Sequence, residues 1–280
     1  MKYFNFHTHT LYCDGKNAPE DFIQTAIKKN MSAIGFSSHS PLPFKNTYCI
    51  KANRVEDYKN EIRELQKKYA NKINVFLALE FDYVPELSDD FSILKNSMGL
   101  DYTIGSVHLV KNKKSGKLWF IDGPEINYTS GLSAIFDNDI KFAVTSFFEQ
   151  SAEMINTQKP TIIGHFDKIK MHNRNRFFKE TEIWYIKLVK QTLDIIRKSG
   201  SIIEVNTRGI YKKRSDSLYP GEEILTEILK SKIPITISAD AHEPHELTSY
   251  YPEAIGNLKD IGFKKIKYFT GKSWDDCEIF

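Results

Sequence analysis

Residues 3–10 of the chain read YFNFHTHT, in which a short aromatic run leads directly into His7 and His9. The run predicts a β-strand, and the two histidines then follow the carboxyl end of that strand. Side chains two positions apart on an extended segment point the same way, so both imidazoles can reach one cation. The stretch therefore predicts a strand that ends beside a candidate metal site.

Six further runs rich in β-branched and aromatic residues also predict strands. They lie at 33–37, 75–79, 102–106, 161–164, 202–205 and 235–238, with a further candidate at 266–270. Between them the chain has helical periodicity, clearest at 55–69, where apolar residues recur three and four positions apart. Strands that alternate with helices indicate parallel βαβ units. Seven or eight units favour a closed α/β barrel, with an open doubly wound sheet as the alternative.

Residues that commonly bind metals follow these strands. In chain order they are His7 and His9, His39, Glu80, His108, His165, and Asp240 with His242, while Asn206 and Arg208 follow the sixth strand. A single histidine after a strand is more often an ordinary loop residue than a ligand. Six of the eight histidines fall at such ends, however, and the carboxyl ends of parallel strands share one face. The combination therefore predicts one metal-binding cluster, and His172 and His245, which follow no predicted strand, are interpreted as ordinary residues.

The composition describes an ordinary folded chain with no marked preference for a charged partner. Of its 280 residues 41% are hydrophobic, and 39 basic against 36 acidic residues give a net charge of +3. This balance argues against disorder and provides no basic stripe for nucleic acid. No apolar run is long enough to span a bilayer, and MKYFNFHTHT has no apolar signal segment. Three widely spaced cysteines fit a reducing compartment, so a cytoplasmic protein is predicted.

Residues 1–280 are predicted to form a single domain, because no low-complexity linker or internal repeat divides the chain. Longer polar segments at 40–53, 109–130 and 207–220 are predicted as loops. The sequence gives no indication of the oligomeric state.

The donor types restrict the choice of metal. Neutral imidazole combined with carboxylate is the ligand set of zinc, manganese or iron rather than of calcium or magnesium alone. Six histidines, Glu80, Asp240 and Asp14 supply more donors than the three or four that one catalytic metal needs, and they suffice for two or three ions. Asp14 precedes Gly15, a pair that also favours turns, so both interpretations of Asp14 stand. The residues alone indicate a multinuclear metal hydrolase.

The motifs in combination resemble the polymerase and histidinol phosphatase (PHP) superfamily, from residue 2 to about residue 263. The motifs are the HxH pair, SSHSP at 37–41, the glutamate after the third strand, GSVH at 105–108, GHFD at 164–167 and SADAH at 238–242. ALEFDYVPE at 78–86, IIGHFDKIK at 162–170 and IEVNTRGIYKKR at 203–214 are similar to the histidinol-phosphatase branch. The resemblance implies a distorted (β/α)7 TIM-like barrel, with the metal site at the C-terminal ends of its strands.

The resemblance also implies how the ligands divide among three metals. The first metal would be held by His7, His9, Glu80 and Asp240. Glu80 would bridge to the second metal, which His108 and His165 share. The third metal would be held by Asp14, His39 and His242.

The same resemblance implies a phosphatase that hydrolyses L-histidinol phosphate, a step of histidine biosynthesis. Two neighbouring cations can lower the pKa of a bridging water and supply hydroxide for attack on the phosphate. Glu80, Asp240 and His242 are the predicted catalytic residues, and Asp240 or His242 would pass a proton to the leaving group. Two alternatives stand beside this reading. One is a PHP phosphoesterase for another small phosphomonoester or a nucleotide end, and the other is a metal-binding module without catalysis.

Basic residues near the predicted strand ends are candidates for binding the phosphate, since guanidinium grips phosphate oxygens bidentately. Arg208 is the first candidate, and Arg174, Arg176, Lys168 and Arg214 are the others. Asp122 is predicted to bind the amine or imidazole of the substrate, and Trp119 or Phe120 could stack on it. The predicted partner is thus a small phosphomonoester, with neither nucleic acid nor a membrane.

Overall fold

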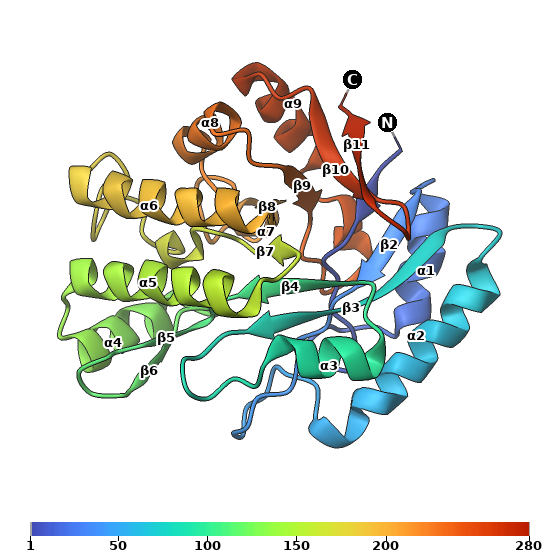
Figure 1. The fold of residues 1–280 in the computed structure, drawn as a ribbon, viewed down its shortest axis with the longest axis horizontal. Helices are drawn as coiled ribbons and strands as arrows, with labels where there is room; N and C mark the ends of the chain where they lie inside the picture. Colours follow the sequence, from blue (N-terminus) through green and yellow to red (C-terminus); the bar gives the residue numbers. More distant parts are fainter. Residues whose placement is uncertain (1, 280) are drawn as a thin grey trace.

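The computed structural model describes residues 2–279 and places seven parallel strands in one nearly closed barrel, with the helices around it (Figure 1). In sheet order the strands are β1 (Phe4–Asn5), β2 (Ala33–Phe36), β3 (Asn74–Asp82), β4 (Tyr102–Ser106), β7 (Ile162–Ile163), β8 (Ile202–Asn206) and β9 (Ile235–Ser238). Every neighbouring pair is parallel, so all seven carboxyl ends lie at the same end of the barrel. The predicted (β/α)7 architecture is confirmed.

The barrel closes between the segments that follow β1 and β9. The backbone N–H of His9 donates to the carbonyl oxygen of Ala241 at 2.8 Å, and the N–H of Ala241 donates to the carbonyl oxygen of His7 at 3.1 Å. Asn5 adds a side-chain link, because its Oδ1 accepts from the N–H of Ala239 at 3.1 Å. The HxH and DxH segments of the sequence are therefore the two sides of the barrel's closing seam.

Helices connect the strands and cover the outside of the barrel. They are α1 (Pro19–Lys28), α2 (Val55–Tyr69), α3 (Phe91–Met98), α4 (Glu125–Phe136), α5 (Ile140–Gln158), α6 (Ile183–Ser199), α7 (Arg208–Tyr211), α8 (Glu222–Lys230) and α9 (Tyr251–Ile261). The predicted helix at 55–69 is α2, which buries Tyr58, Ile62, Leu65 and Tyr69. Spacings of three and four residues place these side chains on one face, which packs on the barrel while the charged face meets solvent.

Two of the three segments predicted as loops contain regular structure. In the segment 109–130, β5 (Leu109–Lys111) pairs antiparallel with β6 (Leu118–Phe120), and α4 begins before the segment ends. The segment 207–220 contains the short helix α7. Short 3-10 turns at Ala52–Arg54, Lys168–Lys170 and Pro244–Thr248 complete the connections. The loop prediction was wrong for β5 and β6 because their pairing is local and their patterns are brief. It was wrong for α7 because its 4 residues are too few to show helical periodicity.

The predicted strand at 266–270 exists but is not an eighth barrel strand. It is β10 (Lys265–Phe269), which pairs antiparallel with β11 (Trp274–Glu278) outside the seven-stranded sheet. Aromatic rings of this hairpin contact aromatic residues on β1, β3 and β4 and Phe6 directly after β1. The ring pairs include Tyr268 with Phe4 at 5.2 Å, Trp274 with Phe6 at 5.3 Å, Phe269 with Phe76 at 4.8 Å and Trp274 with Tyr102 at 5.6 Å. The hairpin covers the end of the barrel opposite the strand carboxyl ends.

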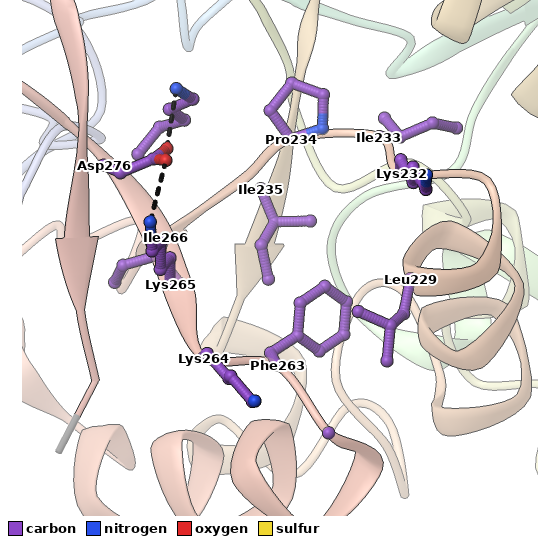
Figure 2. Close-up of a pocket in the computed structure, with 12 residues that line it drawn as sticks. Leu229, Lys232, Ile233, Pro234, Ile235, Phe263, Lys264, Lys265, Ile266 and Asp276 are labelled. Carbon is purple, nitrogen blue, oxygen red and sulfur yellow. Dashed lines mark ion pairs between the residues drawn. The ribbon is translucent and has the colours of Figure 1, made fainter.

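A surface groove of about 420 Å³ also lies at this amino end (Figure 2). Pro234 and Ile235, at the start of β9, line it together with Phe263 and Ile266, and Lys265 and Lys267 pair with Asp276 at its rim. The groove is therefore at the far end of β9 from Asp240. Among residues 2–279, no helix has both the length and the apolar character needed to cross a membrane.

We expect Phe6→Ala to lower the free energy of unfolding by about 3–5 kcal/mol, because it removes a fully buried ring and leaves a cavity. Phe6 is 0% exposed and its ring meets those of Phe4, Phe76, Tyr102, Tyr268 and Trp274. Urea denaturation measures the change. Ile183→Ala is the control, since Ile183 is 86% exposed and its loss should cost less than about 0.5 kcal/mol. Equal effects of the two substitutions would contradict this account of the core.

Candidate metal centre

The nine predicted ligands converge at the carboxyl end of the barrel. His7 and His9 follow β1, His39 follows β2, Glu80 lies on β3, His108 follows β4, His165 follows β7, Asp240 and His242 follow β9, and Asp14 lies in the loop after β1. All except Asp14 and His242 are buried, and those two are partly buried. The structure thus brings together residues from six of the strands, and their role as ligands stays a prediction.

Glu80 lies at the centre of this cluster. Its Oε2 lies 3.2 Å from His7 Nε2, 3.4 Å from His9 Nε2 and 3.0 Å from His39 Nδ1. Its Oε1 lies 2.9 Å from His165 Nε2 and 3.6 Å from His108 Nε2. One carboxylate therefore faces imidazoles on both of its oxygens, which is the geometry expected of a bridging ligand.

Asp240 and Asp14 extend the cluster on the side of the closing seam. Asp240 Oδ1 lies 3.2 Å from His9 Nε2 and 3.5 Å from His242 Nδ1. Asp14 Oδ2 lies 3.3 Å from His242 Nε2, and its Oδ1 lies 3.7 Å from His39 Nε2. Asp14 therefore faces the cluster in addition to ending the turn at 11–14.

Three overlapping sets of these residues could each hold an ion. In each set, one ligand atom per residue lies within 4.8 Å of every other, and the sets are His7–His9–Asp240, His9–Asp14–His39–His242 and His39–Glu80–His108. The first two match groups implied by the family resemblance closely. The third includes His39, whereas the resemblance implies Glu80, His108 and His165. His165 is nevertheless adjacent, because its Nε2 lies 3.1 Å from His108 Nε2.

The donor atoms of the cluster fit a metal because many are buried and unpaired. Within residues 2–279, these buried atoms have no hydrogen-bond partner: His7 Nε2, His9 Nε2, His39 Nδ1, Asp14 Oδ1, Glu80 Oε2 and Asp240 Oδ1. An unsatisfied buried polar atom costs about 1–3 kcal/mol. Several such atoms that face one another are expected where a cation is the shared partner.

The acids of the cluster are ionised at neutral pH, the form that binds cations. Burial alone would raise the pKa of Glu80, but the imidazoles of His7, His39 and His108 hold it well below its usual value. Burial would likewise raise the pKa of Asp240, and His7 and Arg208 reverse that effect. A carboxylate held ionised in a buried site is a ready metal ligand.

The histidines divide according to their neighbours. Burial, with the charge of Lys168, lowers the pKa of His165 to about 4, so its imidazole is neutral at pH 7. Burial would also lower the pKa of His39, but the charges of Glu80 and Asp14 outweigh it and raise the pKa to about 9. Metal binding would displace a proton from His39, since only neutral imidazole is a ligand.

Two carboxylates that sequence reasoning missed support the imidazoles from behind. Asp82 Oδ1 accepts from the backbone N–H of His108 at 2.9 Å, and its Oδ2 lies 3.4 Å from His108 Nδ1. Glu204, on β8, lies 2.6 Å from His7 Nδ1. The available signal was a charged residue inside an apolar strand, in LEFD at 79–82 and IIEVN at 202–206.

Tyr48 is a further neighbour of the cluster that the sequence did not reveal. Its hydroxyl donates to Asp82 Oδ2 at 2.7 Å, and its ring meets the ring of His39 edge-on at 5.1 Å. It also stacks on Phe120 at 5.2 Å. The segment after β2 therefore reaches the mouth of the site, and no local pattern in 40–53 indicates which of its aromatic residues does so.

Three cationic side chains lie around the cluster. Arg208 donates through one guanidinium nitrogen to the carbonyl oxygen of Asp240 at 2.7 Å. Lys168 Nζ lies 2.5 Å from Asp122 Oδ2, and Arg214 lies 2.9 Å from Asp122 Oδ1. Asp122 is thus held between two cations, and its binding of the amine or imidazole of the substrate stays a prediction.

Arg174 and Arg176 are more exposed than these cations. Arg174 lies 3.5 Å from Asp216, and Arg176 lies 2.7 Å from Glu125. Both side chains are more than two-fifths exposed, and the structure does not place them in the ligand cluster. Among the two histidines interpreted as ordinary, His245 is exposed, and the Nε2 of His172 lies 2.9 Å from the carbonyl oxygen of Gly123.

Comparison with known proteins shows the family of the chain. The family model of the PHP domain matches residues 5–208. The histidinol-phosphatase of Bacillus subtilis is 26% identical over 260 residues, which cover 88% of this chain and 95% of that protein.

Two solved structures share the fold. A crystal structure from Listeria monocytogenes, assigned as a histidinol phosphatase, has a TM-score of 0.80 at 20% identity and covers 90% of this chain and 99% of that one. The histidinol phosphate phosphatase of Lactococcus lactis, solved with zinc, L-histidinol and phosphate, has a TM-score of 0.71 at 17% identity and covers 98% of this chain and 99% of that one. At these identities the likeness concerns the barrel alone.

We expect Glu80→Gln to reduce the divalent metal bound per chain, because the neutral amide cannot bridge two cations. The affinity for at least one ion should fall more than about tenfold, since even outer partners of metal ligands typically contribute 10–100-fold. Elemental analysis after dialysis of the metal-loaded protein measures the loss. Glu86→Gln is the matched control, because the Glu86 side chain is 83% exposed and forms an ion pair with Lys111 outside the ligand cluster. Parent metal content in Glu80→Gln would contradict the central role of this carboxylate.

Proposed function

We propose that this chain, which belongs to the PHP domain family, is a metal-dependent phosphatase that hydrolyses L-histidinol phosphate to L-histidinol and inorganic phosphate. The observation that carries the proposal is the convergence of six imidazoles with Glu80, Asp240 and Asp14 at one barrel end. The names of relatives that align with most of the chain support the choice of substrate. So does the Lactococcus lactis structure, which holds L-histidinol and phosphate.

We propose two or three divalent transition metals, zinc, manganese or iron, as the cofactors. His7, His9, Glu80 and Asp240 would hold the first, Glu80, His108 and His165 the second, and Asp14, His39 and His242 the third. When bound, such ions supply Lewis acidity toward the phosphate oxygens and lower the pKa of water. The zinc in the Lactococcus lactis structure supports zinc as one choice.

The chain's own cations are proposed to hold the phosphate. Burial would lower the pKa of Lys168, but Asp122, Asp240 and Glu80 raise it, so Lys168 carries a positive charge. The hydrogen bond from Arg208 to the carbonyl oxygen of Asp240 holds its guanidinium beside the ligand cluster. These charges stabilise the negative charge that grows on the phosphate oxygens during its transfer.

Asp122 is proposed to act on the substrate through its two cations, because it holds both Lys168 and Arg214 in place. The stacked rings of Tyr48 and Phe120 offer an apolar face for the imidazole of the substrate. Asp240 or His242 is proposed to accept the proton that the attacking water loses and to hand it to the leaving alkoxide oxygen. The two side chains are neighbours, with Asp240 Oδ1 3.5 Å from His242 Nδ1.

Arg174 and Arg176 are proposed only as outer contacts of the phosphate, because each pairs with an acid near the surface. One domain over residues 1–280 is also proposed, supported by a hydrophobic core that runs from Phe4 to Ile279. The cytoplasmic location and the independence from nucleic acid and membranes stay predictions from the sequence.

We expect phosphate release to be fastest with L-histidinol phosphate in a panel of small phosphomonoesters and nucleotides. The panel is measured with zinc, manganese or iron supplied. The kcat/KM for L-histidinol phosphate should exceed the kcat/KM for every other substrate by at least about tenfold, because a site that hydrogen-bonds polar groups of its substrate rejects analogues that lack those groups. Chelated protein and Glu80→Gln are the controls. A higher kcat/KM for another phosphomonoester or a nucleotide end would assign the chain to the alternative substrate class.

We expect Arg208→Ala to raise KM for L-histidinol phosphate by about 10–100-fold, because a charge-assisted hydrogen bond contributes about 1.5–3 kcal/mol. Metal content should stay at the parent level, since no guanidinium binds the ions. Steady-state kinetics and elemental analysis measure the two effects. Arg197→Ala is the control, because the Arg197 side chain is 51% exposed on α6. An unchanged KM would remove Arg208 from the phosphate site.

A further inference from the structure

Glu204 is a buried carboxylate that neither the ligand set nor the phosphate contacts include. It lies on β8, between β7 and β9 in the sheet, and is 0% exposed. A buried charge is strongly disfavoured unless other groups compensate it. The hydrogen-bond partners of Glu204 therefore indicate what this carboxylate does in the barrel.

The hydrogen bonds of its carboxylate within residues 2–279 go to two proposed ligands and to Asn206, which bonds a third. Glu204 Oε1 lies 2.6 Å from His7 Nδ1, and its Oε2 accepts from the backbone N–H of His165 at 2.8 Å. Oε2 also accepts from Asn206 Nδ2 at 3.0 Å, and the same amide nitrogen donates to Asp240 Oδ2 at 3.3 Å. Glu204 thus connects ligand segments that follow β1, β7 and β9.

Two of these segments have backbone conformations that need outside support. His165 has φ +24° and Asp240 has φ +52°, in the left-handed region that residues with a Cβ rarely adopt. Such conformations persist where surrounding contacts fix them. The bonds from Glu204 to His165 and through Asn206 to Asp240 are contacts of this kind.

The bond to His7 determines which ring nitrogen faces the metal site. A carboxylate only accepts hydrogen bonds, so His7 must carry a proton on Nδ1 to bond Glu204. The nitrogen left to face a metal is then Nε2, which lies 3.2 Å from Glu80 Oε2 and 3.9 Å from Asp240 Oδ1. Partners of this type fix the tautomer and orientation of metal-binding histidines.

We propose that Glu204 is a positioning residue of the metal centre, which holds His7 as the Nδ1–H tautomer and fixes the segments of His165 and Asp240 around it. The proposal rests on the metal centre of the proposed function and deepens it.

The substitution Glu204→Gln tests the tautomer of His7 directly, because neighbouring donors fix the orientation of the glutamine amide. The N–H of His165 and Nδ2 of Asn206 both donate to the Oε2 position, so the amide oxygen must lie there. The amide NH2 then faces His7 Nδ1 and requires a lone pair on it. His7 is forced to carry its proton on Nε2, toward the metal.

The first readout is the Nδ1–H signal of ¹⁵N-labelled histidine in zinc-saturated protein, and the second is the Kd of each zinc ion from competition with a chelator. We expect the parent to show Nδ1–H at His7, and Glu204→Gln to lose it while the Kd of one zinc ion rises about 10–100-fold. Glu149→Gln, at a side chain 49% exposed, is the matched control and should match the parent in both.

Glu204→Asp separates this role from simple packing, because it keeps the negative charge and shortens the side chain. We expect it to retain the Nδ1–H signal and to bind zinc more tightly than Glu204→Gln does. Equal losses in the two variants would overturn the proposal. Zinc Kd values in Glu204→Gln equal to those of the parent would also overturn it. A parent protein in which His7 carries its proton on Nε2 would overturn it without any variant.

These readouts use no phosphate ester. A parent protein that binds zinc with Nδ1–H at His7 but releases no phosphate from L-histidinol phosphate would reject the proposed function and leave this inference standing. Turnover of that substrate by a parent protein whose His7 lacks Nδ1–H would reject the inference alone.

Discussion

The shared contact of Glu80 with imidazoles on both of its oxygens is the constraint around which this end of the barrel is arranged. A buried carboxylate with five imidazole nitrogens within 3.6 Å requires compensation for the water it has lost. Hydrogen bonds supply part of it, as from the hydroxyl of Ser106 to Oε1 at 2.6 Å. Other buried nitrogen and oxygen atoms of the cluster have no hydrogen-bond partner among residues 2–279, which indicates that bound cations supply the remaining compensation. Metal binding and burial therefore favour the same arrangement of these side chains.

This arrangement is also structural, because the ligand segments close the barrel. His7, His9 and Ala241 exchange the backbone hydrogen bonds that join the two sides of the seam. A change that moves the HxH segment therefore disturbs strand closure together with the ligands. The opposite end depends on apolar packing instead, where the β10–β11 hairpin sets Trp274 and Phe269 against rings of the barrel. The two ends of one barrel are thus held by different forces.

The sequence predicted the barrel and the convergence of the candidate ligands because both follow from local patterns. Strand periodicity shows where each strand stops, and parallel strands stop at one face, so the residue after each strand was informative. The contacts of Glu204, Asp82 and Tyr48 could not be predicted in this way. Glu204 meets His7 across 197 positions of sequence, and only the closed barrel makes that pair neighbours. The prediction of an eighth barrel strand at β10 was wrong for a related reason. Periodicity indicates that a segment is a strand but does not indicate which strand it pairs with.

Chemistry and specificity come from different parts of this chain. The proposed ligands sit mostly at the strand ends, where parallel pairing fixes the backbone, and Glu204 and Asp82 form hydrogen bonds that support them. The cations and rings around them come instead from the connecting segments, as Asp122 after β6 and Arg214 after α7 show. We expect substitutions in these segments to alter the choice of phosphomonoester while the proposed metal centre remains intact. On this account the barrel can change its substrate without rebuilding the proposed ligand set, because the two depend on different parts of the chain.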